Sequence, residues 1–482
     1  MKSPLLILIA ILFLLQGCAQ TDSTQLDTEI QAIENGLQKA VITNIDSVTT
    51  FSILDRMAFY KVPGVSICIV KDGAIRWSKG YGLANPIDSA KVTPNTLFQA
   101  ASISKAIAAA AALKLMEEGL LDLDEDVNQY LKGWQIEDNE FTTENKVTMR
   151  GLLTHSAGVT VSGFPGYSQS DTLPALIHIL NGNGNSPKVY VSSIPGSRWS
   201  YSGGGYTIMQ KVVEDISGTP LEAYMEEHIF KPLQMNHTTF EYLDPEVHLS
   251  KASAAFDSNG ELFEGFWYNY PEKAAAGLWT TPEDLAKYCI EIQQIVAGKQ
   301  NGIFKKETVE AMLTKHTNEN WGLGPSLHGN GDSLRFEHSG NAKGFITDMN
   351  AFAFKGDAVV LFSNGDGASL LNDEILRSVS NYYDWNMISS KEIEVVKLSA
   401  MQLDSLVGHY TFASTATASL FEITARGDFL LLNAGRRGTF ELVPLTSTKF
   451  MDLKAGNEIV FDISKDQVQL TWGGEDKFYK IE

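Results

Sequence analysis

The fold depends on one stretch of sequence, Leu97-Phe98-Gln99-Ala100-Ala101-Ser102-Ile103-Ser104-Lys105, which runs directly into Ala106-Ile107-Ala108-Ala109-Ala110-Ala111-Ala112-Leu113-Lys114-Leu115-Met116. The second part consists of strong helix formers, and Gly119 follows it as a residue that can end a helix. From Ala106 to Leu113 the helix has no polar stripe. A helix that is apolar on every side is buried, so we expect other parts of the chain to pack around it.

Ser102 and Lys105 stand three residues apart at the start of this helix. Side chains at that spacing share one face and can touch. The helix N-terminus and a dry environment both disfavour an ammonium group and lower the pKa of a lysine. A neutral lysine can accept the serine proton and so activate a weak nucleophile. The alternative is a serine that only caps the helix beside a solvated lysine, and Ser-x-x-Lys alone does not decide between them.

The composition limits the possible functions. The chain has 482 residues, which exceeds what one core usually organises and predicts two domains. It carries 38 Lys and Arg against 58 Asp and Glu, a net charge of −20, which argues against a nucleic-acid partner. The nine histidines show no ligand spacing such as His-Glu-x-x-His, so we expect neither a metal nor a cofactor.

The N-terminus predicts export. Met1-Lys2 precedes an apolar stretch over residues 5–15 that is short for a membrane-spanning helix and typical of a secretory signal. It ends in Leu15-Gln16-Gly17-Cys18, which resembles the bacterial lipoprotein cleavage box. Residues 1–18 are then a lipoprotein signal peptide, and a lipid on Cys18 anchors the protein to a membrane of the bacterial cell envelope, facing the periplasm or the outside. The alternative is an ordinary signal peptide with an incidental cysteine. The remaining cysteines, Cys68 and Cys289, are expected to be buried thiols, although an exported protein could pair them.

The periodicity of the chain suggests its elements. A helix is expected over residues 28–60, and a hairpin over residues 65–79 turns at Asp72-Gly73. Strands at residues 348–354 and 358–364 precede a helix at 369–383. Residues 386–405 read as a linker. Short alternating runs over residues 406–482 predict an all-β module of barrel or sandwich type.

Two further residues could carry chemistry. His155 follows a short helix and is either a catalytic base or a buried, hydrogen-bonded histidine. Tyr201 precedes four small residues, Ser202-Gly203-Gly204-Gly205, that allow close backbone approach and leave the phenol exposed at a helix start. The alternative is a tyrosine that anchors a loop.

Seven segments in this order resemble the serine β-lactamase and penicillin-binding-protein superfamily, in particular its class C β-lactamase-like branch. The resemblance covers about residues 31–381. The segments are Val62-Pro63-Gly64-Val65-Ser66, Ser102-Ile103-Ser104-Lys105, Leu152-Leu153-Thr154-His155-Ser156-Ala157-Gly158, Tyr201-Ser202-Gly203, Gly277-Leu278-Trp279-Thr280-Thr281, Trp321-Gly322-Leu323-Gly324 and His338-Ser339-Gly340.

The resemblance implies an α+β domain over residues 28–385, with an antiparallel sheet flanked by helices, an inserted helical subdomain and a cleft between them. It makes Ser102 the nucleophile, with Lys105 and Tyr201 sharing the proton transfer. His338-Ser339-Gly340 occupies the Lys-Thr-Gly position on an edge strand. The backbone N–H groups of Ser102 and Asn341 would form the oxyanion hole.

This chain departs from the family pattern at two positions. Gly203 stands where the family usually has Asn, and His338 stands where β-lactamases carry Lys. A histidine is largely neutral at pH 7, which weakens the attraction for the carboxylate of a β-lactam. We therefore expect a serine hydrolase of peptidase or esterase type that takes a small acyl substrate: an ester, a D-amino-acid peptide or a β-lactam. The alternative is a non-catalytic cell-wall binding or sensor lipoprotein of the penicillin-binding type. The sequence does not specify the oligomeric state.

Overall fold

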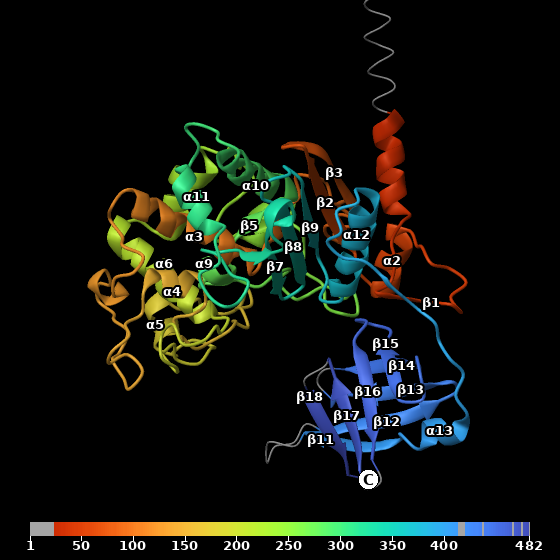
Figure 1. Ribbon diagram of the computed structural model, residues 1–482. Coiled ribbons are helices and arrows are strands. Elements are labelled where there is room, and N and C mark those ends of the chain that lie inside the picture. Colours follow the sequence, from red (N-terminus) through yellow and green to blue (C-terminus); the bar gives the residue numbers. More distant parts are fainter. Residues whose placement is uncertain (1–23, 413–419, 436–437, 465–466, 474–475, 482) are drawn as a thin grey trace, which may run out of the picture. The chain divides into compact units, whose positions relative to one another are not determined.

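The computed structural model describes residues 24–412, 420–435, 438–464, 467–473 and 476–481 (Figure 1). The chain divides into two compact units. One is Met57–Asn372, and the other combines the described residues up to Arg56 with those from Asp373 onward. The predicted signal peptide and Cys18 lie outside the described residues.

The first unit is built on a six-stranded sheet in the order β3-β2-β9-β8-β7-β6, in which every neighbouring pair is antiparallel. The strands are β2 (Gly64–Lys71), β3 (Ala74–Gly82), β6 (Ser326–His328), β7 (Arg335–Ala342), β8 (Phe345–Phe352) and β9 (Ala358–Ser363). The hairpin at Asp72-Gly73 is confirmed, since it joins β2 to β3. β6 pairs with the first three residues of β7, so β7 has no β6 partner beyond Glu337.

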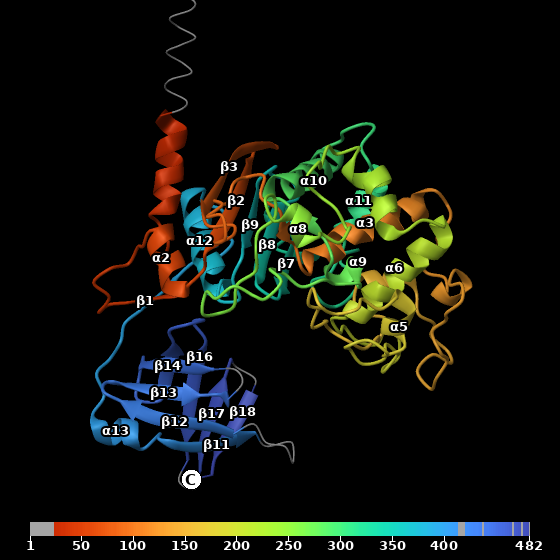
Figure 2. The ribbon, with the colours of Figure 1, turned by 180° about the vertical axis from the view of Figure 1, so that it is seen from behind.

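Helix α3 (Ile103–Glu117) is the buried helix that the sequence predicts. Every residue from Ile103 to Leu113 is buried, and Gly119 follows with φ +73°. Figure 2 shows α5 (Leu176–Leu180) and α6 (Gly203–Ser217) on the side of α3 that lies away from the sheet, and Figure 1 shows α4 (Met149–Leu153) beside them. These helices form the inserted helical subdomain. On the sheet itself, α10 (Pro282–Val296) packs against β2 and β9. The predicted fold class is confirmed.

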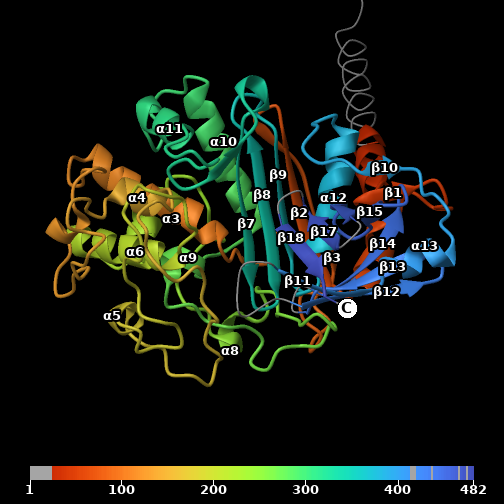
Figure 3. The same cartoon turned by 60° about the horizontal axis from the view of Figure 1, so that its bottom comes forward.

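The second unit contains a closed antiparallel barrel of eight strands (Figure 3). They are β11 (Gly408–Phe412), β12 (Leu420–Arg426), β13 (Phe429–Asn433), β14 (Thr439–Pro444), β15 (Lys449–Asp452), β16 (Glu458–Ile463), β17 (Val468–Trp472) and β18 (Asp476–Lys480). Buried apolar side chains such as Leu432, Phe450 and Phe461 form its core. The predicted all-β module is thus a barrel with a packed interior.

The predicted continuous helix over residues 28–60 is wrong. Residues 24–34 are helical, the chain then forms β1 (Val41–Thr43), and a separate helix α2 (Ile53–Tyr60) follows. The three residues of β1, Val41, Ile42 and Thr43, are all β-branched, which favours a strand, and they pair in parallel with β10 (Lys391–Ile393). Apolar residues at helical spacing up to Val41 suggested one stripe, but the pairing partner lies 350 residues further along the chain.

The region predicted as a linker, residues 386–405, contains β10 and the short helix α13 (Ala400–Asp404). The predicted domain boundaries near 385 and 405 stay predictions. Cys68 and Cys289 are both free and buried in the structure. Within the part of the chain that the structure describes, no helix has the length and apolar character needed to cross a membrane.

Candidate active site

Ser102 lies at the turn that leads into α3. The preceding Ala101 has φ +49°, a conformation that costs free energy in a residue with a Cβ atom and that often occurs at functional sites. The Ser102 side chain makes no capping hydrogen bond to the helix. Its Oγ instead lies 3.1 Å from Nζ of Lys105. The alternative in which Ser102 only caps the helix is therefore wrong.

Lys105 is only 2% exposed. Its Nζ donates a hydrogen bond to the carbonyl oxygen of Ala275 at 2.7 Å, in α9 (Lys273–Ala276). Burial lowers the pKa of Lys105 from 10.5 to about 7. A large share of this amine is therefore neutral near pH 7, as its position at the mouth of the buried helix predicts.

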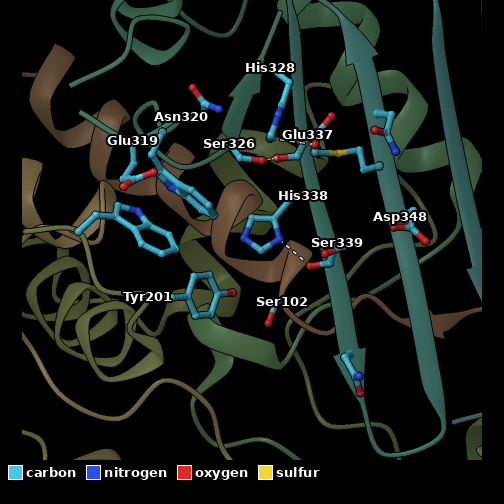
Figure 4. A pocket seen from close by; sticks show the side chains of 15 residues that line it. Ser102, Tyr201, Glu319, Asn320, Ser326, His328, Glu337, His338, Ser339 and Asp348 are labelled. Atoms are coloured by element: carbon cyan, nitrogen blue, oxygen red, sulfur yellow. Dashed lines mark hydrogen bonds and ion pairs between the residues drawn. The ribbon is translucent and has the colours of Figure 1, made fainter. Parts of the chain in front are cut away.

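Tyr201 comes from a separate segment, just before α6. Figure 4 shows its hydroxyl directed toward Ser102, and Nζ of Lys105 lies 4.9 Å from the centre of its ring. Burial raises the pKa of Tyr201 to about 12, and its side-chain interaction with Ser102 acts in the opposite direction. The phenol therefore keeps its proton at neutral pH. Ser202 holds this segment in place, because its Oγ accepts the backbone N–H of Gly205 at 2.8 Å.

The position of Gly203 explains one departure from the family pattern. A Cβ atom added there would lie 2.9 Å from the Phe164 ring and 3.2 Å from the Ser162 carbonyl oxygen. The Phe164 ring thus takes the space into which a side chain at residue 203 would project. An asparagine would fit only if Phe164 moved.

Strand β7 lies directly against the chain that precedes the nucleophile. A Cβ atom on Gly340 would come within 2.4 Å of the Ala100 carbonyl oxygen and 2.2 Å of Thr347 Oγ1. Only glycine allows this approach, which Thr347 supports through a 3.0 Å hydrogen bond to the same carbonyl. Ser339 and Asn341 both line the cleft beside Ser102. The oxyanion role of the Ser102 and Asn341 amides stays a prediction.

His338 is a neutral side chain. It is 6% exposed, and burial lowers its pKa to about 3, with the charge of Lys105 acting in the same direction. Its Nδ1 lies 2.6 Å from the Ser339 carbonyl oxygen. A carbonyl oxygen can only accept, so Nδ1 carries the ring hydrogen.

His155 lies under Tyr201 and does not contact Ser102. Its Nδ1 accepts the backbone N–H of Ser202 at 3.0 Å, and its ring centre lies 4.3 Å from that of Tyr201. Burial is the main reason that its pKa lies well below the ordinary value. Of the two alternatives, the structure supports the buried, hydrogen-bonded histidine, which positions Tyr201.

These elements surround a cleft of about 600 Å³ (Figure 4). Ser102, Tyr201, His338, Ser339 and Asn341 all line it. Sequence reasoning missed ten further residues of the lining, which are Trp199, Glu319, Asn320, Trp321, Ser326, His328, Glu337, Asp348, Met349 and Asn350. Trp321 lies in a segment that resembles the family, and Trp199 lies two residues before another such segment. Those segments were the available signal, but the sequence offered no reason to place either tryptophan in the cleft. Within the described ranges, no group of three or more His, Cys, Asp or Glu side chains could hold a metal ion.

Comparison with known proteins gives consistent results. The Beta-lactamase family model matches residues 52–378. A protein of Escherichia coli O157:H7 named "Putative D-alanyl-D-alanine carboxypeptidase" is 30% identical over 308 residues, which cover 56% of this chain and 69% of the relative. The "putative penicillin-binding protein PbpX" of Bacillus subtilis is 27% identical over 304 residues, covering 61% of this chain and 69% of that protein.

Solved structures share the fold. The octameric penicillin-binding protein homologue from Pyrococcus abyssi superposes with a TM-score of 0.60 at 24% identity, over 89% of this chain and 98% of the homologue. The D-amino acid amidase from Ochrobactrum anthropi, in complex with L-phenylalanine amide, superposes with a TM-score of 0.54 at 21% identity, over 69% of this chain and 98% of the amidase.

The match to the Beta-lactamase family model spans more than half of the chain. It includes the Ser102, Tyr201 and His338 segments, which the fold assembles around one cleft. Assignment to the class C branch stays a prediction. This chain belongs to the beta-lactamase family of serine hydrolases and penicillin-binding proteins.

Proposed function

We propose that this protein is a serine hydrolase that forms an acyl-enzyme on Ser102. One observation carries the proposal: Nζ of Lys105 lies 3.1 Å from Oγ of Ser102, in a buried setting where the pKa of the lysine is about 7. A base with a pKa near the working pH is the most effective proton acceptor. Membership of the beta-lactamase family supports the same chemistry.

The hydrogen bonds suggest how the proton moves. Lys105 donates one N–H to the Ala275 carbonyl, so the lone pair of the neutral amine is available to the Ser102 hydroxyl. Ser102 Oγ attacks the carbonyl carbon of the substrate while Lys105 accepts the proton. Tyr201, whose raised pKa keeps it protonated, then donates to the leaving group and is reprotonated from Lys105. Water hydrolyses the acyl-enzyme and restores the Ser102 hydroxyl, and the amides of Ser102 and Asn341 stabilise the oxyanion in both steps.

Small esters and D-amino-acid amides without a free carboxylate fit this site better than β-lactams. His338 is neutral where β-lactamases carry a lysine, so the site lacks one attraction for a carboxylate. The E. coli relative is named for D-alanyl-D-alanine carboxypeptidase activity, and the Ochrobactrum neighbour is a D-amino acid amidase, which supports acyl substrates of the amino-acid type.

A serine-directed fluorophosphonate tests the proposal. We expect one covalent adduct by intact mass, located on Ser102 and absent in Ser102→Ala. Ser197→Ala, an exposed serine on the loop before Tyr201, serves as the matched control and should label like the wild type. Labelling that persists in Ser102→Ala, or no labelling of the folded wild type at pH 8, would overturn the proposal.

The Phe164 ring that excludes a side chain at residue 203 favours a second candidate, a penicillin-binding sensor, because an amide group of the family's site is missing. Incubation with esters, D-alanyl-D-alanine peptides and penicillins separates the two. Adducts that form and disappear with release of the acid indicate a hydrolase. Adducts that form and persist with every compound indicate a sensor.

We also propose that the protein is anchored to the bacterial cell envelope by a lipid on Cys18. The support is the Leu15-Gln16-Gly17-Cys18 segment after an apolar stretch. In cells fed radioactive palmitate, the wild type should be labelled and should sediment with membranes. Cys18→Ser should lose both properties, and an unlabelled wild type would exclude the anchor.

A further inference from the structure

The Ser102 cleft has an acidic lining. Three of its lining residues are carboxylates, and the described residues that line it include no lysine or arginine. Lys105 contacts Ser102 but does not itself line the cleft, and its lowered pKa leaves a large share of its amine uncharged near pH 7. A substrate held in this cleft therefore meets more negative than positive charge.

The three carboxylates differ in what surrounds them. Nε2 of His328 lies 3.2 Å from the Glu337 carboxylate, and Arg335 pairs with Glu337 at 3.4 Å and offsets its charge. Asp348 accepts a hydrogen bond from Asn372 at 2.9 Å. Glu319 is exposed and has no ion pair within the described part of the chain. Its charge is therefore the most available to a ligand.

One other cation approaches the rim without lining it. Lys315 donates to Oδ1 of Asn320, next to Glu319, at 2.7 Å. The ammonium group keeps its charge when it donates to this amide, but Lys315 does not line the cleft.

The second observation concerns His338, which lies on β7 beside Ser339. Because Nδ1 donates to the Ser339 carbonyl and the ring is neutral, Nε2 carries a lone pair. This Nε2 atom is buried and has no hydrogen-bond partner among the described residues, while the side chain lines the cleft. A lysine at this position would donate to a substrate carboxylate, whereas this histidine can only accept.

We infer that the cleft selects acyl substrates that carry a protonated amine, with Glu319 as the counter-charge and Nε2 of His338 as the acceptor for an N–H or O–H group of the substrate. This inference rests on the proposed function, since it concerns how a substrate is held for attack by Ser102. Both features disfavour a substrate carboxylate. An unmet buried acceptor is costly, so a donor that reaches Nε2 gains more than it would in water.

A protection assay tests this inference whether or not a compound is hydrolysed. The rate of fluorophosphonate labelling of Ser102 is measured at pH 7 in the presence of three p-nitroanilides: D-alanine, N-acetyl-D-alanine and N-succinyl-D-alanine, with the L forms in parallel. They share the alanyl group and the leaving group and differ at the amino end, which is cationic, neutral or anionic. We expect the free amine to protect at about tenfold lower concentration than the acetyl compound, and the succinyl compound to protect least.

Three variants sharpen the assay. Glu319→Gln should narrow the preference for the free amine over the acetyl compound several-fold. Glu307→Gln, an exposed glutamate on α11 (Lys306–Met312) outside the cleft, should leave the preference unchanged. His338→Lys should shift the preference toward the succinyl compound. High salt should reduce the wild-type preference, because the rim charge is exposed.

The outcomes separate the two levels of the proposal. If Ser102 is not labelled at all, the proposed function fails. If Ser102 is labelled but no compound protects at millimolar concentration, or the succinyl compound protects as well as the free amine, the inference is wrong. It is also wrong if Glu319→Gln leaves the ratio between the free amine and the acetyl compound unchanged.

Discussion

The barrel and the Ser102 cleft differ in whether certain buried polar groups have hydrogen-bond partners. In the barrel, Asp452 is fully buried, and its carboxylate accepts the backbone amides of Lys454 at 2.7 Å and Ala455 at 3.1 Å. The buried Tyr410 hydroxyl donates to the Leu406 carbonyl at 2.7 Å. These groups are paired, so they stabilise the module and have nothing left for a ligand.

The cleft keeps several polar atoms without partners. Nε2 of His338 and the indole nitrogens of Trp199 and Trp321 are buried, and the described residues offer them no hydrogen bond. Nε2 of His155, which lies behind the lining under Tyr201, also has no partner there. Each such atom costs roughly 1–3 kcal/mol of stability. Atoms of this kind also occur outside the cleft, at Tyr288 and Gln293 and, in the barrel, at Nδ1 of His409. The contrast therefore concerns particular groups: Asp452 and Tyr410 are paired in the barrel, whereas His338 and the two tryptophans of the cleft keep atoms that a substrate could pair. Five predictions test this contrast, in order of decreasing effect.

Removing the amine beside Ser102 should have the largest effect. Lys105→Ala should slow acylation by between about 10²-fold and 10⁴-fold, because the nucleophile loses its proton acceptor. The matched control is Lys449→Ala, an exposed lysine of the barrel paired with Glu458, which should leave the rate unchanged. Burst-phase kinetics with an ester substrate measures both.

The same assay should show a pH dependence in the wild type. The acylation rate should rise as Lys105 loses its proton, with an apparent pKa near 7, and then level off. A flat profile from pH 6 to 8 would exclude a titrating lysine as the acceptor.

The barrel core should affect stability without affecting the chemistry. Leu432 is fully buried, and Leu432→Ala should lower the free energy of unfolding by about 2–5 kcal/mol. Leu420→Ala, on the neighbouring strand with 53% of the side chain exposed, should cost much less. Urea unfolding of the full chain measures the loss. If either variant slowed labelling of Ser102 tenfold under native conditions, the barrel would be part of the catalytic machinery and the comparison would be wrong.

Glu272 is a buried carboxylate without partners among the described residues, in contrast to the paired carboxylate of Asp452. It is fully buried, and burial raises its pKa from 4.5 to about 7. Below pH 4.5 it is protonated in both the folded and unfolded chain. As the pH rises to 7 the unfolded chain loses this proton first, so stability falls, by at most about 3 kcal/mol, and then stays constant.

Glu272→Gln should therefore stabilise the protein above pH 7 and have little effect at pH 4. Asp452→Asn, which alters the paired carboxylate of the barrel, should destabilise it at pH 8. Thermal unfolding at the two pH values measures both changes. If both variants changed the stability in the same direction at pH 8, the contrast between Glu272 and Asp452 would be wrong.

Substituting two glycines by alanine should change the free energy of unfolding least. Gly340→Ala forces a Cβ atom against the Ala100 carbonyl and should cost about 1–3 kcal/mol and slow labelling of Ser102, because β7 has to move away from the nucleophile. Gly427, in the barrel turn between β12 and β13, has φ +62° and open space around it. Gly427→Ala should cost about 1 kcal/mol through its backbone alone and leave labelling unchanged. A normal labelling rate in Gly340→Ala would show that the close approach of β7 is not needed.

The local parts of the fold could be predicted. Burial of α3, the Asp72-Gly73 hairpin and the all-β character of the last strands follow from patterns within short windows. The helix expected over residues 28–60 was wrong because β1 depends on β10, a partner that no local pattern identifies. Trp321 and Glu319 were missed in the cleft for the same reason, since their segment reaches Ser102 only through the folded sheet.

By itself the sequence determined the pairing of Ser102 with Lys105, because the geometry of one helical turn brings residues three apart together whatever surrounds them. Folding is what lowers the pKa of Lys105 to about 7, leaves His338 as an acceptor and places Phe164 in the space beside Gly203. Charge state and available space depend on desolvation and packing by segments far away in the chain, and those exist only once the chain has folded.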